Sequence, residues 1–202
     1  DKGEEYYIEK IRAKLKKAVL DQLVADVEVG SYLSGGLDSG SITAIASQSK
    51  KRWKAFTCGF DVSVSDKIER LFDEREKAEI ISSMYNIEHY QMVIHSGDLE
   101  WALPQVIWHI EDLRIGMSYP HYYMARLASK FVKVVLSGPG GDEILGGYPW
   151  RYRIHSKSRE EFPDKYYQFW CRLIPDYKKK DFFTRNVLKE IIGFNSKEIF
   201  NK

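Results

Sequence analysis

Residues 27–39 read VEVGSYLSGGLDS, a mainly apolar run from Val27 to Leu33 that leads directly into the hexapeptide SGGLDS. A short apolar run bounded by glycine predicts a strand. A hydroxyl residue such as Ser39, placed just before an amphipathic pattern, predicts the start of a helix. The stretch therefore predicts a strand, a tight turn and a helix in that order.

The turn between this strand and helix has the composition of an anion site. Gly35 and Gly36 let amide N–H groups approach a ligand closely, Ser34 and Ser39 add hydroxyl donors, and the helix start adds partial positive charge. Asp38 would repel a bare phosphate, but a magnesium ion can bridge its carboxylate to phosphate oxygens. The hexapeptide matches neither the Walker P-loop nor the Gly-x-Gly-x-x-Gly turn. The alternative is an ordinary strand-to-helix turn.

A second turn repeats this order about a hundred residues later. The apolar run 134–136, VVL, leads into 137–143, SGPGGDE, and then into 144–148, ILGGY. Asp142 could share a magnesium ion with Asp38, or hold a second one. The alternative is a glycine-rich turn in which Asp142 only caps a helix.

Helical and extended patterns alternate along the rest of the chain. We expect helices at 8–26, from Ser39 onward, at 73–85, at 99–110 and at 120–130, with Pro120 opening the last of them. We expect strands at 27–33, 53–60, 89–94 and 131–136, and a loop at 61–72. This alternation predicts an α/β fold with an open parallel sheet and helices on both faces. Ligands of such sheets bind at the carboxyl ends of the strands, so we expect both glycine-rich turns to face one cleft.

Composition narrows the class of protein. The 202 residues carry 31 Lys and Arg against 29 Asp and Glu, a balance that argues against a general nucleic-acid binder. No stretch is apolar enough to span a membrane, and two cysteines, Cys58 and Cys171, point to a reducing, cytoplasmic setting. The start has neither a secretory signal nor a Met, so we expect a piece of a larger protein. The five histidines show no metal-ligand spacing, and Arg114 could contact a carboxylate substrate or form a salt bridge.

The segment 150–202 differs from the rest, with 13 Lys and Arg against 7 Asp and Glu and with 12 aromatic residues. Such a segment could bind nucleic acid, but its charges are scattered and no nucleic-acid motif accompanies them. We therefore expect its aromatic residues to pack on a part of the protein that is missing from this chain. We divide the chain into an α/β part at 1–149, which carries both glycine-rich turns, and an incomplete, mainly helical part of the same domain at 150–202.

The hexapeptide at 34–39 resembles the pyrophosphate-binding loop of the ATP pyrophosphatase superfamily. The second turn, 137–148, closely resembles a signature of the asparagine synthetase family, in its synthetase domain with the adenine nucleotide alpha hydrolase-like fold. The segments 56–59, 73–75 and 109–112 also resemble the family, and the resemblance covers roughly residues 5–152.

The resemblance implies an ATP-dependent ligase with ATP and Mg²⁺ as cofactors. ATP would adenylate the side-chain carboxylate of aspartate with release of pyrophosphate, and ammonia would then give asparagine and AMP. It implies nucleotide contacts at Leu33, Ser34, Gly35, Gly36, Leu37, Asp38, Ser39, Cys58, Ser137 and Gly138. It implies metal ligation by Asp38 and Asp142, and catalytic roles for Asp142 and Glu143.

Three departures from the family pattern leave the substrate, the ammonia source and part of the site open. Pro139 stands where the family usually has a glutamate, which leaves open a member that amidates or cyclises another carboxylate, or a nucleotide-binding module without turnover. The chain lacks the family's glutaminase domain, so ammonia would come from that domain of the full-length protein, which could be a homodimer. The family's catalytic lysine and much of its amino-acid site are expected beyond residue 202.

Overall fold

The computed structural model describes residues 2–61, 73–112, 116–149, 158–170 and 174–201. Two units, residues 1–142 and 143–202, are each compact by themselves. Most of the loop expected at 61–72, and Arg114, lie outside the described residues. The prediction that the ATP half ends at residue 149 stays a prediction.

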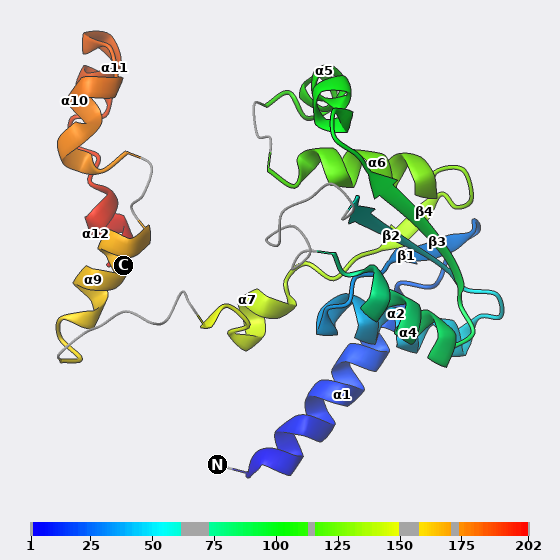
Figure 1. Cartoon of the computed structure of the whole chain (residues 1–202). Helices are drawn as coiled ribbons and strands as arrows, with labels where there is room; N and C mark the ends of the chain where they lie inside the picture. The colour runs from blue at the N-terminus through cyan, green and yellow to red at the C-terminus, as the bar shows by residue number, and fades with distance from the viewer. Residues whose placement is uncertain (1, 62–72, 113–115, 150–157, 171–173, 202) are drawn as a thin grey trace. The chain divides into compact units, whose positions relative to one another are not determined.

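A four-stranded parallel sheet forms the centre of the first unit, in the order β3-β2-β1-β4 (Figure 1). The strands are β1 (Val29–Tyr32), β2 (Lys54–Phe60), β3 (Glu88–Ile94) and β4 (Val134–Leu136). Strands β2 and β3 lie on one side of β1, whereas β4 lies on its other side. The strand order therefore reverses at β1. The predicted α/β class with a parallel sheet is confirmed.

Helices cover both faces of this sheet, as the alternating pattern predicts. One face carries α1 (Glu4–Asp21), α2 (Leu37–Ser49) and α4 (Arg75–Met84), and the other carries α5 (Asp98–Ile110) and α6 (Ser118–Ala128) (Figure 1). Strand β2 shows why both faces are apolar. Ala55 packs with Leu33 and Ala78 on the α4 face, whereas Phe56 packs with Ala128 and Val132 on the α6 face. Successive side chains of a strand point to opposite faces, so both neighbours on β2 are buried.

Helices α1 and α6 differ from their predicted bounds. Helix α1 ends at Asp21 rather than near Asp26, because Leu23 reaches the core from a turn that follows the helix. Helix α6 begins at Ser118 and not at Pro120. Proline is tolerated there because the first turn of a helix has no intrahelical partner for its N–H groups.

The strand predicted at 131–136 is present only in its second half. Strand β4 is only three residues long, and Val134 is 42% exposed. The amides of Phe131 and Val132 instead bond to the carbonyl of Ala128, at 2.9 Å each, and close the end of α6. Since β4 stands at the end of the sheet order, it is covered less than β1 and β2.

A buried polar network links β1, α2 and the start of β2. Trp53 Nε1 donates to Ser31 Oγ at 2.9 Å, and Ser31 Oγ lies 2.8 Å from Thr43 Oγ1. These groups are almost fully buried, and buried polar groups need partners to avoid a desolvation cost. The network therefore fixes how α2 packs against the strand that precedes it.

The second unit is mainly helical in the part of the chain that the structure describes. It contains α9 (Phe162–Trp170), η1 (Asp176–Lys178), α10 (Lys179–Phe182), α11 (Arg185–Glu190) and α12 (Ser196–Phe200), and α7 (Gly141–Leu145) spans its start. Among the described residues of both units, none of the helices combines the length and apolar character that crossing a bilayer requires.

Asp176 joins three helical segments of this unit. Its carboxylate pairs with Lys179 and accepts hydrogen bonds from Ser196 Oγ at 2.8 Å, from Ser196 N at 3.2 Å and from Tyr167 Oη at 3.1 Å. The Lys179 ammonium, followed by the Ser196 hydroxyl, lowers the pKa of Asp176 from 3.8 to about 2. The unit is thus held together by an ionised carboxylate.

We expect this contribution to stability to depend on pH below 4. A carboxyl whose pKa is lower in the folded state stabilises the fold fully above its unfolded pKa, and the effect is lost as pH falls through the folded value. Carboxyl chemical shifts measured by NMR from pH 5 to pH 1.5 should place the Asp176 midpoint near 2. Ser196→Ala should raise that midpoint. An Asp176 midpoint near 4 in the unsubstituted chain would contradict the assignment.

Candidate functional site

The first glycine-rich turn follows β1 directly and is held by its own two serines. Ser39 Oγ accepts from Ser34 N at 3.0 Å and lies 2.7 Å from Ser34 Oγ, and Ser34 Oγ accepts from Gly36 N at 3.1 Å. Both hydroxyls are therefore used within the turn, and Ser39 is buried. In this structure the serines shape the loop and also accept from the amides of Ser34 and Gly36, so the amides of Gly35 and Leu37 are the loop groups best placed to meet an anion.

Helix α2 begins at this turn with Leu37, after Gly36 as its N-cap. The first N–H groups of a helix have no intrahelical acceptor, and the helix dipole favours negative charge there. Asp38 lies in this first turn, while the side chain of Leu37 is 81% exposed. The geometry that the sequence predicts, a strand end feeding a helix N-terminus, is present.

The second glycine-rich turn lies against the first. A Cβ on Gly138 would come 2.9 Å from Ser39 N, and a Cβ on Gly141 would come 2.3 Å from the Asp38 carboxylate. These approaches follow from the parallel pairing of β1 with β4, in which Ser31 is the partner of Leu136. The two turns are therefore neighbours, and they meet at the reversal of strand order where sheets of this type bind ligands. That they face one cleft stays a prediction.

Pro139 and Gly140 form the tip of the second turn. Gly140 has a φ of 108°, a conformation that side chains rarely adopt, and Pro139 is exposed. Proline offers neither a charge nor an N–H group, so this position contributes only its shape and its carbonyl oxygen.

Behind the first turn, Leu33 is held by the neighbouring strand. Its side chain is 2% exposed, its N–H donates to the Phe56 carbonyl at 2.9 Å, and its carbonyl accepts from Thr57 Oγ1 at 2.6 Å. Since Thr57 donates to Leu33, it can only accept from His89 Nε2, which lies 2.7 Å away. Burial lowers the pKa of His89 and so favours its neutral ring, which can make this donation as the tautomer with a proton on Nε2. Leu33 thus has a packing role, and its nucleotide contact stays a prediction.

Cys58 lies two residues before the end of β2 and packs on the α5 and α6 face. It joins the cluster around Ile94, Ala102 and Val106, and burial raises the pKa of its thiol to about 11. A thiol with such a pKa is protonated at neutral pH and is a poor nucleophile. The surroundings of Cys58 therefore do not favour nucleophilic catalysis, and its nucleotide contact stays a prediction.

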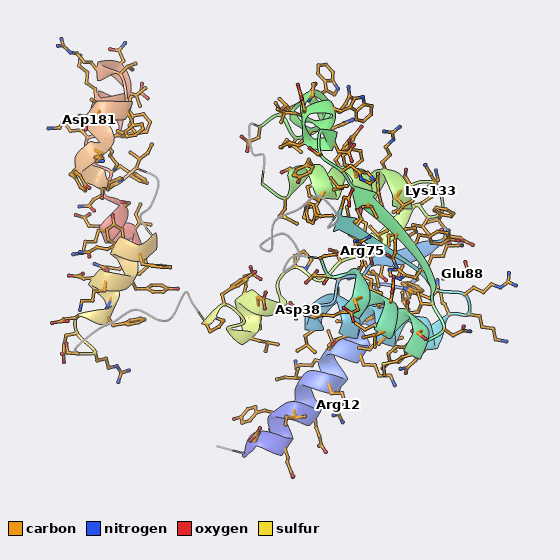
Figure 2. All side chains as sticks on the ribbon, viewed as in Figure 1. Arg12, Asp38, Arg75, Glu88, Lys133 and Asp181 are labelled. Carbon is orange, nitrogen blue, oxygen red and sulfur yellow. The ribbon has the colours of Figure 1, made fainter. Side chains whose placement is uncertain are left out.

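Sequence reasoning missed two cations that α4 brings to the same edge of the sheet. Arg75 lies across Gly59, forms a bidentate pair with Asp73 at 2.6 and 2.8 Å and donates to the Phe60 carbonyl at 3.0 Å (Figure 2). Lys77 packs against Gly35 in the first turn. The predicted order of strands and helices could have located both residues. A helix that follows a parallel strand begins near that strand's carboxyl end, so the first residues of α4 lie at the edge of the sheet where ligands bind.

The acidic groups near the turns fit magnesium only together with a phosphate ligand. Asp38 and Asp142 are both partly buried and Asp142 follows Gly141, but within the described ranges no three His, Cys, Asp or Glu side chains gather as a metal site. Mg²⁺ is usually held by one or two carboxylates plus substrate phosphates, so this donor set suits it. Glu143 belongs to the second unit, where its Oε1 accepts from Tyr148 Oη at 3.1 Å, and its catalytic role stays a prediction.

Comparison with known proteins agrees with these motifs. Residues 10–195 match the family model described as asparagine synthase. The chain is 36% identical over 141 residues to a putative glutamine-hydrolysing asparagine synthetase of Mycobacterium bovis, which covers 69% of this chain and 21% of the relative. It is 33% identical over 162 residues to glutamine-hydrolysing asparagine synthetase 1 of Bacillus subtilis, which covers 79% of this chain and 24% of the relative.

The chain thus spans about a fifth to a quarter of the length of these relatives. Among solved structures, the NH3-dependent NAD synthetase of Campylobacter jejuni aligns with 96% of this chain and 86% of its own, with 17% sequence identity and a TM-score of 0.45. That likeness is too low to carry an argument.

We expect Gly138→Ala to destabilise the first unit by about 1 to 3 kcal/mol, because its Cβ would press on the backbone of α2. Urea unfolding followed through the amide NMR signals of residues 2–142 would measure the change. Gly193→Ala is the matched control, since a Cβ there meets nothing within 4 Å. Equal stability of the two variants would contradict the contact between the turns.

Proposed function

This chain belongs to the asparagine synthase family, and on that premise we propose that the protein containing it is an ATP-dependent, AMP-forming amide ligase. The observation that carries the proposal is the contact between the two acidic, glycine-rich turns at the ends of β1 and β4. Each turn alone is compatible with an ordinary strand-to-helix connection. Together they provide backbone amides, a helix N-terminus and carboxylates at one ligand-binding edge.

In the first step a substrate carboxylate oxygen attacks the α-phosphorus of ATP. The bond from that phosphorus to the bridging oxygen breaks, and pyrophosphate leaves with the bonding electrons. Ammonia then attacks the acyl carbon and loses a proton, and AMP leaves to give the amide. The protein's contribution is to hold the leaving phosphates in line and to stabilise the charge that develops on them.

We assign the β- and γ-phosphates to the first turn, with the amides of Gly35 and Leu37 and the start of α2 as donors, and with Gly36 leaving room for the ligand. Ser34 and Ser39 keep that turn in shape. We assign Ser137 and Gly138 to the adenosine side, and a Cβ on Gly138 would come 2.9 Å from Ser39 N. Magnesium, held by Asp38 and Asp142, would neutralise phosphate charge when bound.

For the full-length protein that contains this chain, the family implies further assignments. Aspartate is the carboxylate that the family implies, and ammonia would come from a glutaminase domain. The free thiol of Cys58 supports a reducing, cytoplasmic setting. Asp142 would act on the pyrophosphate side, with Glu143 as the second acidic candidate, and the homodimer is a further expectation for the full-length protein.

We expect Asp38→Asn to reduce carboxylate-dependent pyrophosphate release by the full-length protein about 100-fold or more, because it removes a carboxylate that would hold the magnesium ion whose charge offsets that of the leaving phosphates. The substitution keeps the size of the side chain, and circular dichroism should show an unchanged fold. Asp21→Asn, which removes an exposed carboxylate at the end of α1, is the control. Full activity of Asp38→Asn would refute the assignment of the turn.

A second candidate keeps the nucleotide chemistry and changes the acceptor. It rests on Pro139, which cannot bind a metal or steer a carboxylate as the glutamate usual in the family can. Pyrophosphate release measured with aspartate and with a panel of other carboxylic acids separates the two. We expect aspartate to give the largest kcat/KM. A larger value for another acid, together with a shift toward aspartate in Pro139→Glu, would favour the second candidate.

A further inference from the structure

Lys77 reaches the first glycine-rich turn from α4. A Cβ built on Gly35 would lie 2.4 Å from Lys77 Cβ and 2.7 Å from Lys77 Cδ, so the stem of the lysine runs directly across the glycine. Helix α4 begins at Arg75, at the carboxyl edge of the sheet where the turns meet. Figure 2 shows Arg75 and Asp38 at the starts of their two helices, which cover the same face. Lys77 therefore lies over the loop rather than along the outside of its own helix.

The ammonium of Lys77 has no partner among the described residues, unlike the cation beside it. Arg75 is committed to Asp73 and to the Phe60 carbonyl. Lys77 forms neither an ion pair nor a side-chain hydrogen bond in the part of the chain that the structure describes. The aliphatic stem of Lys77 packs against Gly35, although the residue as a whole is exposed. Its ammonium group is therefore free to meet a ligand.

The charges around the turns make a cation useful at this place. Asp38 and Asp142 bring two carboxylates to an edge where the proposed function puts a triphosphate. Like charges so close oppose one another, and metal ions offset only part of that repulsion. A lysine is a compact point charge that suits phosphate oxygens without demanding a fixed bidentate geometry.

We propose that Lys77 is a phosphate-binding residue that contacts the β- and γ-phosphates of ATP and the pyrophosphate that leaves. The proposal rests on the proposed function, because it needs a nucleotide at the first turn. It also gives a second reason for glycine at position 35, where a Cβ would displace the lysine stem.

Binding of magnesium pyrophosphate to the full-length protein, measured by titration calorimetry, tests the proposal without requiring turnover. Lys77→Met keeps a long apolar stem and removes the charge, and we expect it to weaken binding at least 10-fold. Lys77→Arg keeps the charge and should stay within about threefold of the unsubstituted protein. Lys133→Met is the matched control, because Lys133 is an exposed lysine just before β4, at the opposite edge of the sheet (Figure 2).

Unchanged pyrophosphate affinity in Lys77→Met, or an equal loss in Lys133→Met, would overturn the proposal, as would absence of pyrophosphate binding by the unsubstituted protein. Failure of the proposed function has a different result. In that case the full-length protein binds pyrophosphate in a Lys77-dependent way but releases none from ATP with any carboxylate.

Discussion

Parallel pairing of β1 with β2 on one side and with β4 on the other is the constraint on which the first unit depends. It places the residues after Leu33 and after Leu136 side by side, and it makes β1 the point where the strand order reverses. Helix α2 can leave the sheet only along the second turn, with Ser39 N facing Gly138. The buried network of Trp53, Ser31 and Thr43 then fixes that helix on its strand.

Close packing explains why the site is rich in glycine. Gly138 and Gly141 leave room for the start of α2 and for the Asp38 carboxylate, and Gly35 leaves room for Lys77. The same close packing also brings charged groups together, because Asp38 from α2 and Lys77 from α4 meet at one loop. Among the described glycines at 34–39 and 137–143, Gly140 alone has a positive φ and is needed for backbone conformation rather than for space. The absence of a side chain at Gly35, Gly138 and Gly141 therefore shapes the site as much as the side chains of Asp38 and Lys77 do.

Much of this could be predicted from the chain. Strong periodic patterns located α2, β2, β3 and α5 to within a few residues, because both faces of the sheet are buried and the apolar pattern is continuous. Prediction failed where apolar residues reach the core from outside a regular element. Leu23 packs from a turn after α1, and Val132 packs from the turn that closes α6. Burial at those positions is real, but hydrogen bonding decides that they are neither helix nor strand.

The sequence by itself determined the two glycine-rich acidic turns, their position after apolar strands and therefore the α/β class. Composition and order suffice for these, since tight turns and helix starts depend on local residues. Only the tertiary structure decided that Asp38 lies against Gly141, that Thr57 and His89 hold the Leu33 carbonyl, and that Lys77 crosses Gly35. These contacts join residues from 24 to 103 positions apart, so no local pattern encodes them, and they follow from the order in which the strands pair.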